Sequence, residues 1–203
     1  ITIPDSVTTI GSSAFENSSL QNITIPSSVT SIADETFYYC GNLTSVTIPD
    51  SVTTIGWGAF DLCENLTYIF FQGDAPTLVS DFSEIASNAA AYVMNHEATG
   101  YAASFGGLPV HTAQHLSFFY DDAGITITGC DTSVSGALTI PAEIGGLPVT
   151  SIADEAFEVC TALTSVTVPD SVTSIGESAF LASTSLHSSH LRFSFNDSFN
   201  AIT

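Results

Sequence analysis

Short apolar stretches alternate with polar residues along much of the chain, and the alternation recurs at a regular interval. The stretch 46–48 reads Val-Thr-Ile, which is the pattern of a half-buried strand, and Pro49 removes a backbone donor and ends the pairing. A second β-branched stretch follows at 52–55 after a bend, and a small helical or irregular turn then brings Phe60 inward. The pattern therefore predicts two short strands and one turn in each unit.

The whole segment occurs several times at fixed offsets. Close copies stand at 1–11, 23–32, 46–56 and 166–176, and each unit carries a phenylalanine in the same role. These phenylalanines are Phe15, Phe37, Phe60, Phe157 and Phe180, spaced by 22 or 23 residues within a block, and three residues later stand Ser18, Cys40, Cys63, Cys160 and Ser183. One unit cannot bury its own apolar face, so the units must stack into a solenoid with like residues in columns about 4.8 Å apart.

The repeated residues resemble a known family. The pattern LTSVTIPDSVTSIGxxAFxxC, as it stands at 43–63 and 163–180, is similar to the BspA-like (Treponema pallidum-type) leucine-rich repeat. The motif is specific, because leucine, Ile-Pro, Val-Thr-x-Ile and Ala-Phe fall at fixed offsets several times over. The resemblance implies a leucine-rich-repeat solenoid of short β-strands with small helical or irregular turns. It also implies the common role of such proteins, adhesion or protein–protein contact at a bacterial or protist surface.

Two repeat blocks with an inserted cap region are expected. Residues 1–72 form the first block, and 73–115 form a closing coil and cap with a short helix at 98–105 that ends at a glycine pair. Residues 116–203 form the second block, which opens with a β-hairpin and closes with a diverged last repeat.

The diverged repeat is recognised by its middle, since 193–202 overlays 166–175 with a displacement of 27 residues. The chain thus begins and ends inside a repeat. We expect either a fragment of a longer chain or ends that another molecule covers.

Composition narrows the function classes. The chain has 203 residues, with 21 acidic side chains against one basic one and a formal net charge of −20. With 44% hydrophobic and only 11% charged residues it is expected to fold. Phosphate binding depends on lysine and arginine, so nucleic acid is excluded as a partner, and no apolar run is long enough for a transmembrane segment. No catalytic motif is present, and we expect a protein without enzymatic activity.

The cysteines of the repeat occupy one inward column. Cys40, Cys63 and Cys160 are interpreted as small buried hydrophobes with free thiols, and a Cys40–Cys63 disulfide is the alternative. Cys130 lies near the expected hairpin and has no evident partner in the sequence.

Threonines form two outward columns. Those on the first strand are Thr2, Thr24, Thr47 and Thr167, and those on the second are Thr8, Thr30, Thr53 and Thr173. A flat array of hydroxyls and methyls could bind glycans or ice. The simpler interpretation is that threonine suits exposed β positions, and Phe70 interrupts the first column.

Acidic residues and glycosylation sequons also recur. Asp5, Asp50 and Asp170 share one turn position, and stacked like charges repel, so weak Ca²⁺ binding is the alternative to a solvated acidic face. Further acids cluster at the turn, at Asp34-Glu35, Asp154-Glu155 and Glu177. Sequons for N-glycosylation stand at Asn17, Asn22, Asn42, Asn65 and Asn196.

The main hypothesis is a non-enzymatic, extracellular or cell-surface leucine-rich-repeat module for adhesion or protein–protein interaction, with a protein bearing a basic patch as the natural partner. An alternative is a structural subunit whose open repeat ends pair with another copy of itself, head to tail, in an extracellular filament. A glycan- or ice-binding surface is the third hypothesis.

Overall fold

The computed structural model describes residues 3–82, 84–113, 115–121, 123–158, 160–186 and 191–193. In these ranges the regular structure consists of strands, joined by turns and bends, with no helix. The chain divides into two compact units, Ile1–Thr112 and Ala113–Thr203, and each is described by itself.

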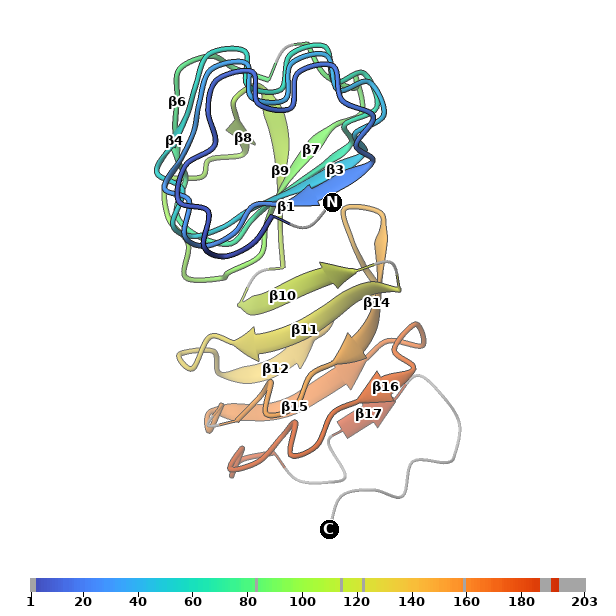
Figure 1. Cartoon of the computed structure of the whole chain (residues 1–203). Helices are drawn as coiled ribbons and strands as arrows, with labels where there is room; N and C mark the ends of the chain where they lie inside the picture. Colours follow the sequence, from blue (N-terminus) through green and yellow to red (C-terminus); the bar gives the residue numbers. More distant parts are fainter. Residues whose placement is uncertain are drawn as a thin grey trace. The chain divides into compact units, whose positions relative to one another are not determined.

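The longer sheet of unit 1 (residues 1–112) is built from one strand per coil. Its order is β1 (Asn22–Thr24), β3 (Ser45–Ile48), β5 (Tyr68–Phe71), β7 (Ala90–Val93), β9 (Leu108–Thr112) and β8 (Ser104–Phe105). The pairs from β1 to β9 are parallel, and β8 is antiparallel to β9. Parallel pairing between strands one repeat apart is the geometry of a solenoid, and the blue to green traces of Figure 1 follow nearly the same closed path.

A second, smaller sheet lies after the turn of each coil. It consists of β2 (Ser31–Ile32), β4 (Thr54–Ile55) and β6 (Thr77–Leu78), all parallel. The bend between the two sheets is a tight turn that follows the proline, since the N–H of Val29 bonds to the carbonyl of Pro26 at 3.0 Å and that of Val52 to Pro49 at 3.1 Å. The two strands and the bend that the sequence predicts are therefore confirmed in these coils.

The interior of unit 1 consists of columns of equivalent side chains. Ile23, Val46, Ile69 and Ala91 lie in register on successive strands, and all four are buried. The Phe37 ring stacks on that of Phe15 at 5.3 Å between centroids and on that of Phe60 at 5.2 Å, with planes within 2° and 9° of parallel. Such pairs add about 0.5–1.5 kcal/mol each beyond the area they bury.

The short helix expected at 98–105 is wrong. Residues Ser104–Phe105 form β8, which pairs with Leu108–Pro109 of β9 across a two-residue turn. Gly106 and Gly107 have φ of 55° and 84°, the left-handed values that such hairpin turns require at both central positions. A glycine pair suits a helix end and a hairpin turn equally well, and the partner strand β9 decides between them.

Side chains of the closing coil fasten it to the coil before. The carboxylate of Asp74 accepts hydrogen bonds from the N–H of Thr99 at 2.6 Å and from its hydroxyl at 2.9 Å, and these bonds lower the pKa of Asp74. The hydroxyl of Tyr101 donates to the carbonyl of Gly73 at 3.1 Å. Burial of the Tyr101 ring raises the pKa of its hydroxyl.

Unit 2 (residues 113–203) repeats the two-sheet plan. One sheet has the order β10 (Leu116–Asp121), β11 (Gly124–Cys130), β14 (Leu147–Ile152) and β13 (Glu143–Ile144), with β16 (Ser174–Ile175) also paired to β14. The other has the order β12 (Gly136–Thr139), β15 (Leu163–Val168) and β17 (Leu191–Phe193). Strands β10 and β11 form an antiparallel hairpin, and β11 joins the parallel array through β14. The stacked Phe157 and Phe180 rings, 4.9 Å apart, continue the phenylalanine pattern in this unit.

The last strand pairs in a different register from the one expected. Leu191 lies opposite Val166 and Phe193 opposite Val168, an offset of 25 residues, whereas the sequence overlay placed Phe193 on Val166. A change of two residues keeps the alternation along a strand in phase, so the sequence pattern fits both registers.

The cysteines do not all share one state. Cys130 and Cys160 form a disulfide, whereas Cys40 and Cys63 are buried free thiols. The interpretation of Cys160 as a free thiol is therefore wrong, and so is the alternative of a Cys40–Cys63 bridge. Cys130 lies at the end of β11, which serves as the coil before Cys160 although its sequence lacks the repeat motif.

Candidate binding surfaces

The outward column of the first strand contains few threonines. Thr24 and Thr47 lie opposite each other on β1 and β3, and the next positions are Phe70 on β5 and Tyr92 on β7. In unit 2, Thr167 lies opposite Thr139. Thr2 lies outside the described residues. The expected array of hydroxyls is thus two residues long in each described sheet.

The outward column of the second strand serves contacts between coils. Thr8, Thr30, Thr53 and Thr173 are exposed. The hydroxyl of Thr53 donates to the carbonyl of Thr30, and that of Thr173 to the carbonyl of Thr150, each at 3.3 Å. The corresponding N–H groups bond to the same carbonyls. These threonines therefore fix the spacing of the coils as well as covering them.

An aromatic group occupies the outward face of the longer sheet of unit 1, and the sequence analysis noted only its first member as an interruption. Tyr68 and Phe70 have centroids 6.1 Å apart, Phe70 and Tyr92 lie 5.2 Å apart, and Tyr92 and His111 lie 5.1 Å apart. The constant repeat length would have found the group, because it places Phe70 and Tyr92 directly in the threonine column.

The aspartates considered for Ca²⁺ do not come together. Asp5, Asp50 and Asp170 are all exposed at their turns, but Ser27 separates the first two and the third belongs to unit 2. The described part of the chain contains no group of three or more histidine, cysteine or acidic side chains that could hold a metal ion. No arrangement of these aspartates in the structure favours Ca²⁺ over a solvated acidic face.

The acids of the turn have a structural use. The carboxylate of Asp34 accepts a hydrogen bond from the N–H of Trp57 in the next coil at 2.8 Å, and that of Asp154 accepts one from the N–H of Glu177 at 2.7 Å. Asp61 lies beside two further acids of the following coil. Partial burial, then Glu84 and Asp81, raise its pKa.

The sequon asparagines differ in what their side chains do. Asn17, Asn22 and Asn42 are exposed. The Nδ2 of Asn65, the atom that would carry a glycan, donates to the carbonyl of Gly41 at 2.5 Å. Asn196 lies outside the described residues. Asn65 is therefore occupied by a contact between coils, and the first three remain available for modification.

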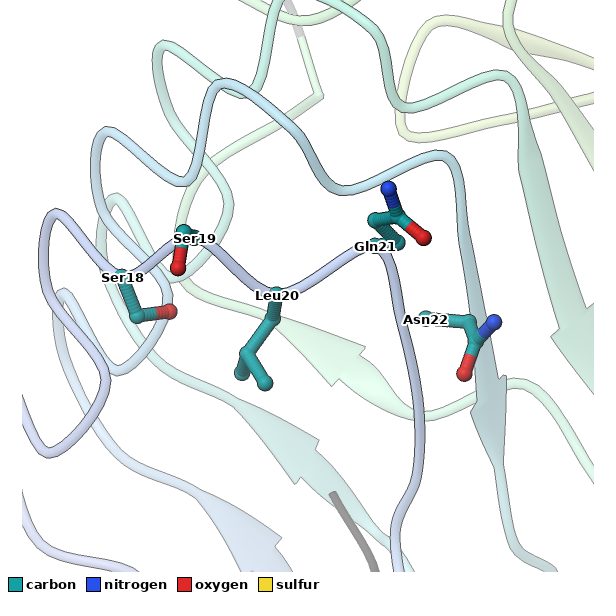
Figure 2. A pocket seen from close by; sticks show the side chains of 5 residues that line it. All are labelled: Ser18, Ser19, Leu20, Gln21 and Asn22. Atoms are coloured by element: carbon teal, nitrogen blue, oxygen red, sulfur yellow. The ribbon is translucent and has the colours of Figure 1, made fainter.

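The surface near the first coils is hollowed. A depression of about 380 Å³ follows the stretch Ser18–Asn22. Figure 2 shows Leu20 pointing toward the interior of the coil, with the amides of Gln21 and Asn22 farther along the same stretch. Small hydroxyl and amide groups line this surface, so it suits ligands that both donate and accept hydrogen bonds.

A family model describes most of the chain. The model of the BspA-type leucine-rich repeat region matches residues 1–89 and 138–202 with six copies. The chain belongs to the BspA-type leucine-rich repeat family. The expectation from the repeated motif is confirmed, and so is the leucine-rich-repeat solenoid, with turns that are irregular in the described residues.

Several solved structures of bacterial leucine-rich repeat proteins are similar to this chain. A leucine-rich cell surface protein from Faecalibacterium prausnitzii is 21% identical, with a TM-score of 0.33, over 96% of this chain and 68% of that one. The pneumococcal vaccine antigen PcpA is 18% identical, with a TM-score of 0.39, over 96% of this chain and 50% of that one. A leucine-rich repeat protein of T. pallidum is 19% identical, with a TM-score of 0.25, over 84% of this chain and 79% of that one.

The chain thus spans about half the length of the pneumococcal protein. A search among curated proteins finds no match. The assignment to the BspA-type family rests on the repeat match. None of the helices that would be needed to cross a bilayer occurs in the described residues.

Proposed function

We propose that this BspA-type chain is a non-enzymatic module that works outside the cell or on its surface, where it mediates adhesion or protein–protein contact. The observation that carries the proposal is the register of equivalent residues. Thr24 lies opposite Thr47, and Thr139 opposite Thr167, so side chains of one kind are presented at a fixed spacing on each sheet. A regular surface of this kind suits recognition of an extended partner.

Bonds between coils make the surface rigid. The hydroxyl of Ser51 donates to the carbonyl of Val29 at 2.7 Å, and that of Ser28 to the carbonyl of Val7 at 2.6 Å. Each coil of unit 1 is thereby held by side chains as well as by strand pairing. A surface that is ordered before binding loses little conformational entropy on association.

Charge and the disulfide support the partner and the compartment. With 21 acidic side chains and one basic one, the chain complements a protein with a basic patch. The Cys130–Cys160 disulfide favours an oxidising compartment, because disulfides persist outside the reducing cytosol.

A binding screen tests the proposal. The purified chain is applied to an array of extracellular proteins at 50 and 500 mM NaCl. We expect basic proteins to bind and their binding to fall at high salt. The triple variant Asp5→Ser, Asp50→Ser, Asp170→Ser should bind more weakly, whereas Ser12→Ala, an exposed change without charge, should bind like the native chain. Binding that ignores both salt and the three aspartates would contradict the proposal.

A filament is the second candidate, and the position of two strands favours it. Among the described strands β1 pairs only with β3 and β17 only with β15, so each lies at the edge of its sheet. Edge strands are templates for pairing with another chain. Light scattering and negative-stain microscopy over a concentration series distinguish the two candidates. Discrete monomers at high micromolar concentration would exclude the filament, and unbranched fibres would support it.

A further inference from the structure

A shallow groove of about 260 Å³ crosses the first three coils of unit 1. Side chains from all three coils line it, among them Asn17, Ser19, Tyr39, Asn42, Leu62 and Glu64. Ser18 and Ser19, both labelled in Figure 2, line this groove and also the neighbouring depression. The volume lies below the roughly 300–1,000 Å³ of pockets for drug-sized ligands, so the groove fits one ring of a larger ligand.

Tyr39 is the residue of the groove that the fold does not require. Its side chain is 53% exposed and its φ is 58°, a left-handed value that is unfavourable for a bulky residue. The equivalent positions Asn17, Leu62 and Ala182 have φ of 54°, 59° and 55°, so the turn imposes this conformation whatever the side chain. The N–H of Tyr39 holds the turn by bonding to the carbonyl of Asp61 at 2.9 Å. An aromatic ring here contributes to the surface and not to the core.

The polar side chains around Tyr39 have hydrogen-bonding capacity to spare. Asn17, Ser19, Asn42 and Glu64 are exposed, and within the described part of the chain their side chains form no hydrogen bond. The amides and the hydroxyl each donate and accept, and the carboxylate accepts only. A ligand that satisfies this set must itself both donate and accept at several neighbouring points.

We propose that this groove binds a neutral carbohydrate. The apolar face of one sugar ring packs on the Tyr39 ring beside Leu62, and its hydroxyls bond to the amides of Asn17 and Asn42 and to the carboxylate of Glu64. Each sugar hydroxyl donates and accepts, which matches those partners. The groove is lined by no cation and contains Glu64, so anionic sugars are repelled. This site is separate from the threonine columns and does not depend on the protein-binding proposal.

A glycan array tests the assignment. The chain is produced in a bacterial host that adds no N-glycans, because a glycan on Asn17 or Asn42 would fill the groove. The array presents mannose-, galactose- and N-acetylglucosamine-terminated glycans beside sialylated and sulfated ones. We expect retention of one or more neutral glycans and none of the anionic ones, followed by titration of the best neutral glycan.

Two variants locate the binding. Tyr39→Asn places at this turn the residue that the first coil already has, so it should fold at least as well, and thermal unfolding checks that it does. It should weaken binding of the neutral glycan at least tenfold. Trp57→Ala removes another half-exposed aromatic, 52% exposed and outside the groove lining, and should change binding less than twofold.

Three results would overturn the proposal. They are an array without any neutral glycan bound, a preference for anionic glycans, and neutral-glycan binding that Tyr39→Asn leaves unchanged. If the array is silent and Tyr39→Asn abolishes binding of a protein found in the screen above, the groove is a protein site and the carbohydrate assignment is wrong.

Discussion

The thiol of Cys63 donates a hydrogen bond to the backbone carbonyl of Phe37, one coil earlier, at 3.1 Å. Cys40 bonds in the same way to Phe15 at 3.0 Å, and the hydroxyl of Ser183 bonds to Phe157 at 2.7 Å. Cysteine and serine therefore alternate at this repeat position because each is a small donor that ties one coil to the previous one. The position has a structural role that hydrophobicity alone does not explain.

Substitution of Cys63 tests this role. Cys63→Ser keeps a donor and should change the free energy of unfolding by less than about 1 kcal/mol. Cys63→Ala removes the donor, and should cost about 0.5–1.5 kcal/mol more than the serine variant, since the carbonyl of Phe37 still accepts the N–H of Cys40. Urea titration measures both values. A serine variant less stable than the alanine variant would contradict the assigned role.

The buried thiol also predicts a pH dependence. Burial raises the pKa of Cys63 from 9.0 to about 12. In the unfolded chain the thiol ionises near its ordinary pKa, so its contribution to stability is complete below pH 9 and is lost as the pH rises toward 12. Stability should therefore fall with pH more steeply in the native chain than in Cys63→Ser, by up to about 1.4 kcal/mol per pH unit. Equal slopes between pH 9 and 11 would show that the thiol is not buried.

Two glycines should respond in opposite ways to alanine. A Cβ at Gly56 would lie 2.5 Å from the carboxylate oxygen of Asp34 and 2.7 Å from the backbone carbon of Ala33, so Gly56→Ala should cost about 1–3 kcal/mol. A Cβ at Gly41 meets nothing within 4 Å, and Gly41→Ala should be neutral or stabilise by up to about 1 kcal/mol. Thermal unfolding measures the pair. Equal effects would show that adjacent coils are not this close at Gly56.

The phenylalanine stack should carry much of the stability of unit 1. Phe37 is fully buried between Phe15 and Phe60, so Phe37→Ala should cost about 3–5 kcal/mol. Phe37→Leu should cost clearly less, because it leaves a smaller cavity. Tyr39→Ala, an exposed neighbour, serves as the control and should stay within about 1 kcal/mol. A small loss for Phe37→Ala would mean that the ring is not in the core.

Reduction should weaken unit 2 selectively. The Cys130–Cys160 disulfide closes a loop of 30 residues, and such a loop contributes about 3–4 kcal/mol in the chain-entropy model. Dithiothreitol should therefore lower the melting temperature of the native chain. The variant Cys130→Ser, Cys160→Ser should melt at the lower temperature with or without reductant. A native chain that is insensitive to reductant would show that the bond does not form.

The repeated motif was sufficient to predict the coils, because every apolar position of the motif fills one column. Val46 and Ile48 point inward in register with the next strand, as their alternation with Thr47 requires. The segments without the motif were harder. Gly106-Gly107 fits a helix end or a hairpin turn, and only the pairing of Phe105 with Leu108 decides.

Long-range partners were the other source of error. Cys130 has no repeat signature, so its bond to Cys160 depends on β11 taking the place of a coil, which the sequence pattern does not indicate. The groove at Tyr39 was missed for a different reason. It is formed by side chains of three coils whose turn positions vary in identity, and only their left-handed backbone is constant.

Whether this repeat module stands outside the cell is decided most directly by labelling the cells that produce it. Antibodies against the folded chain are applied to intact and to permeabilised cells, with and without prior treatment by an external protease. We expect intact cells to be labelled and the protease to remove that label. Label that appears only after permeabilisation, and that the protease leaves untouched, would contradict a role in adhesion or contact at the surface.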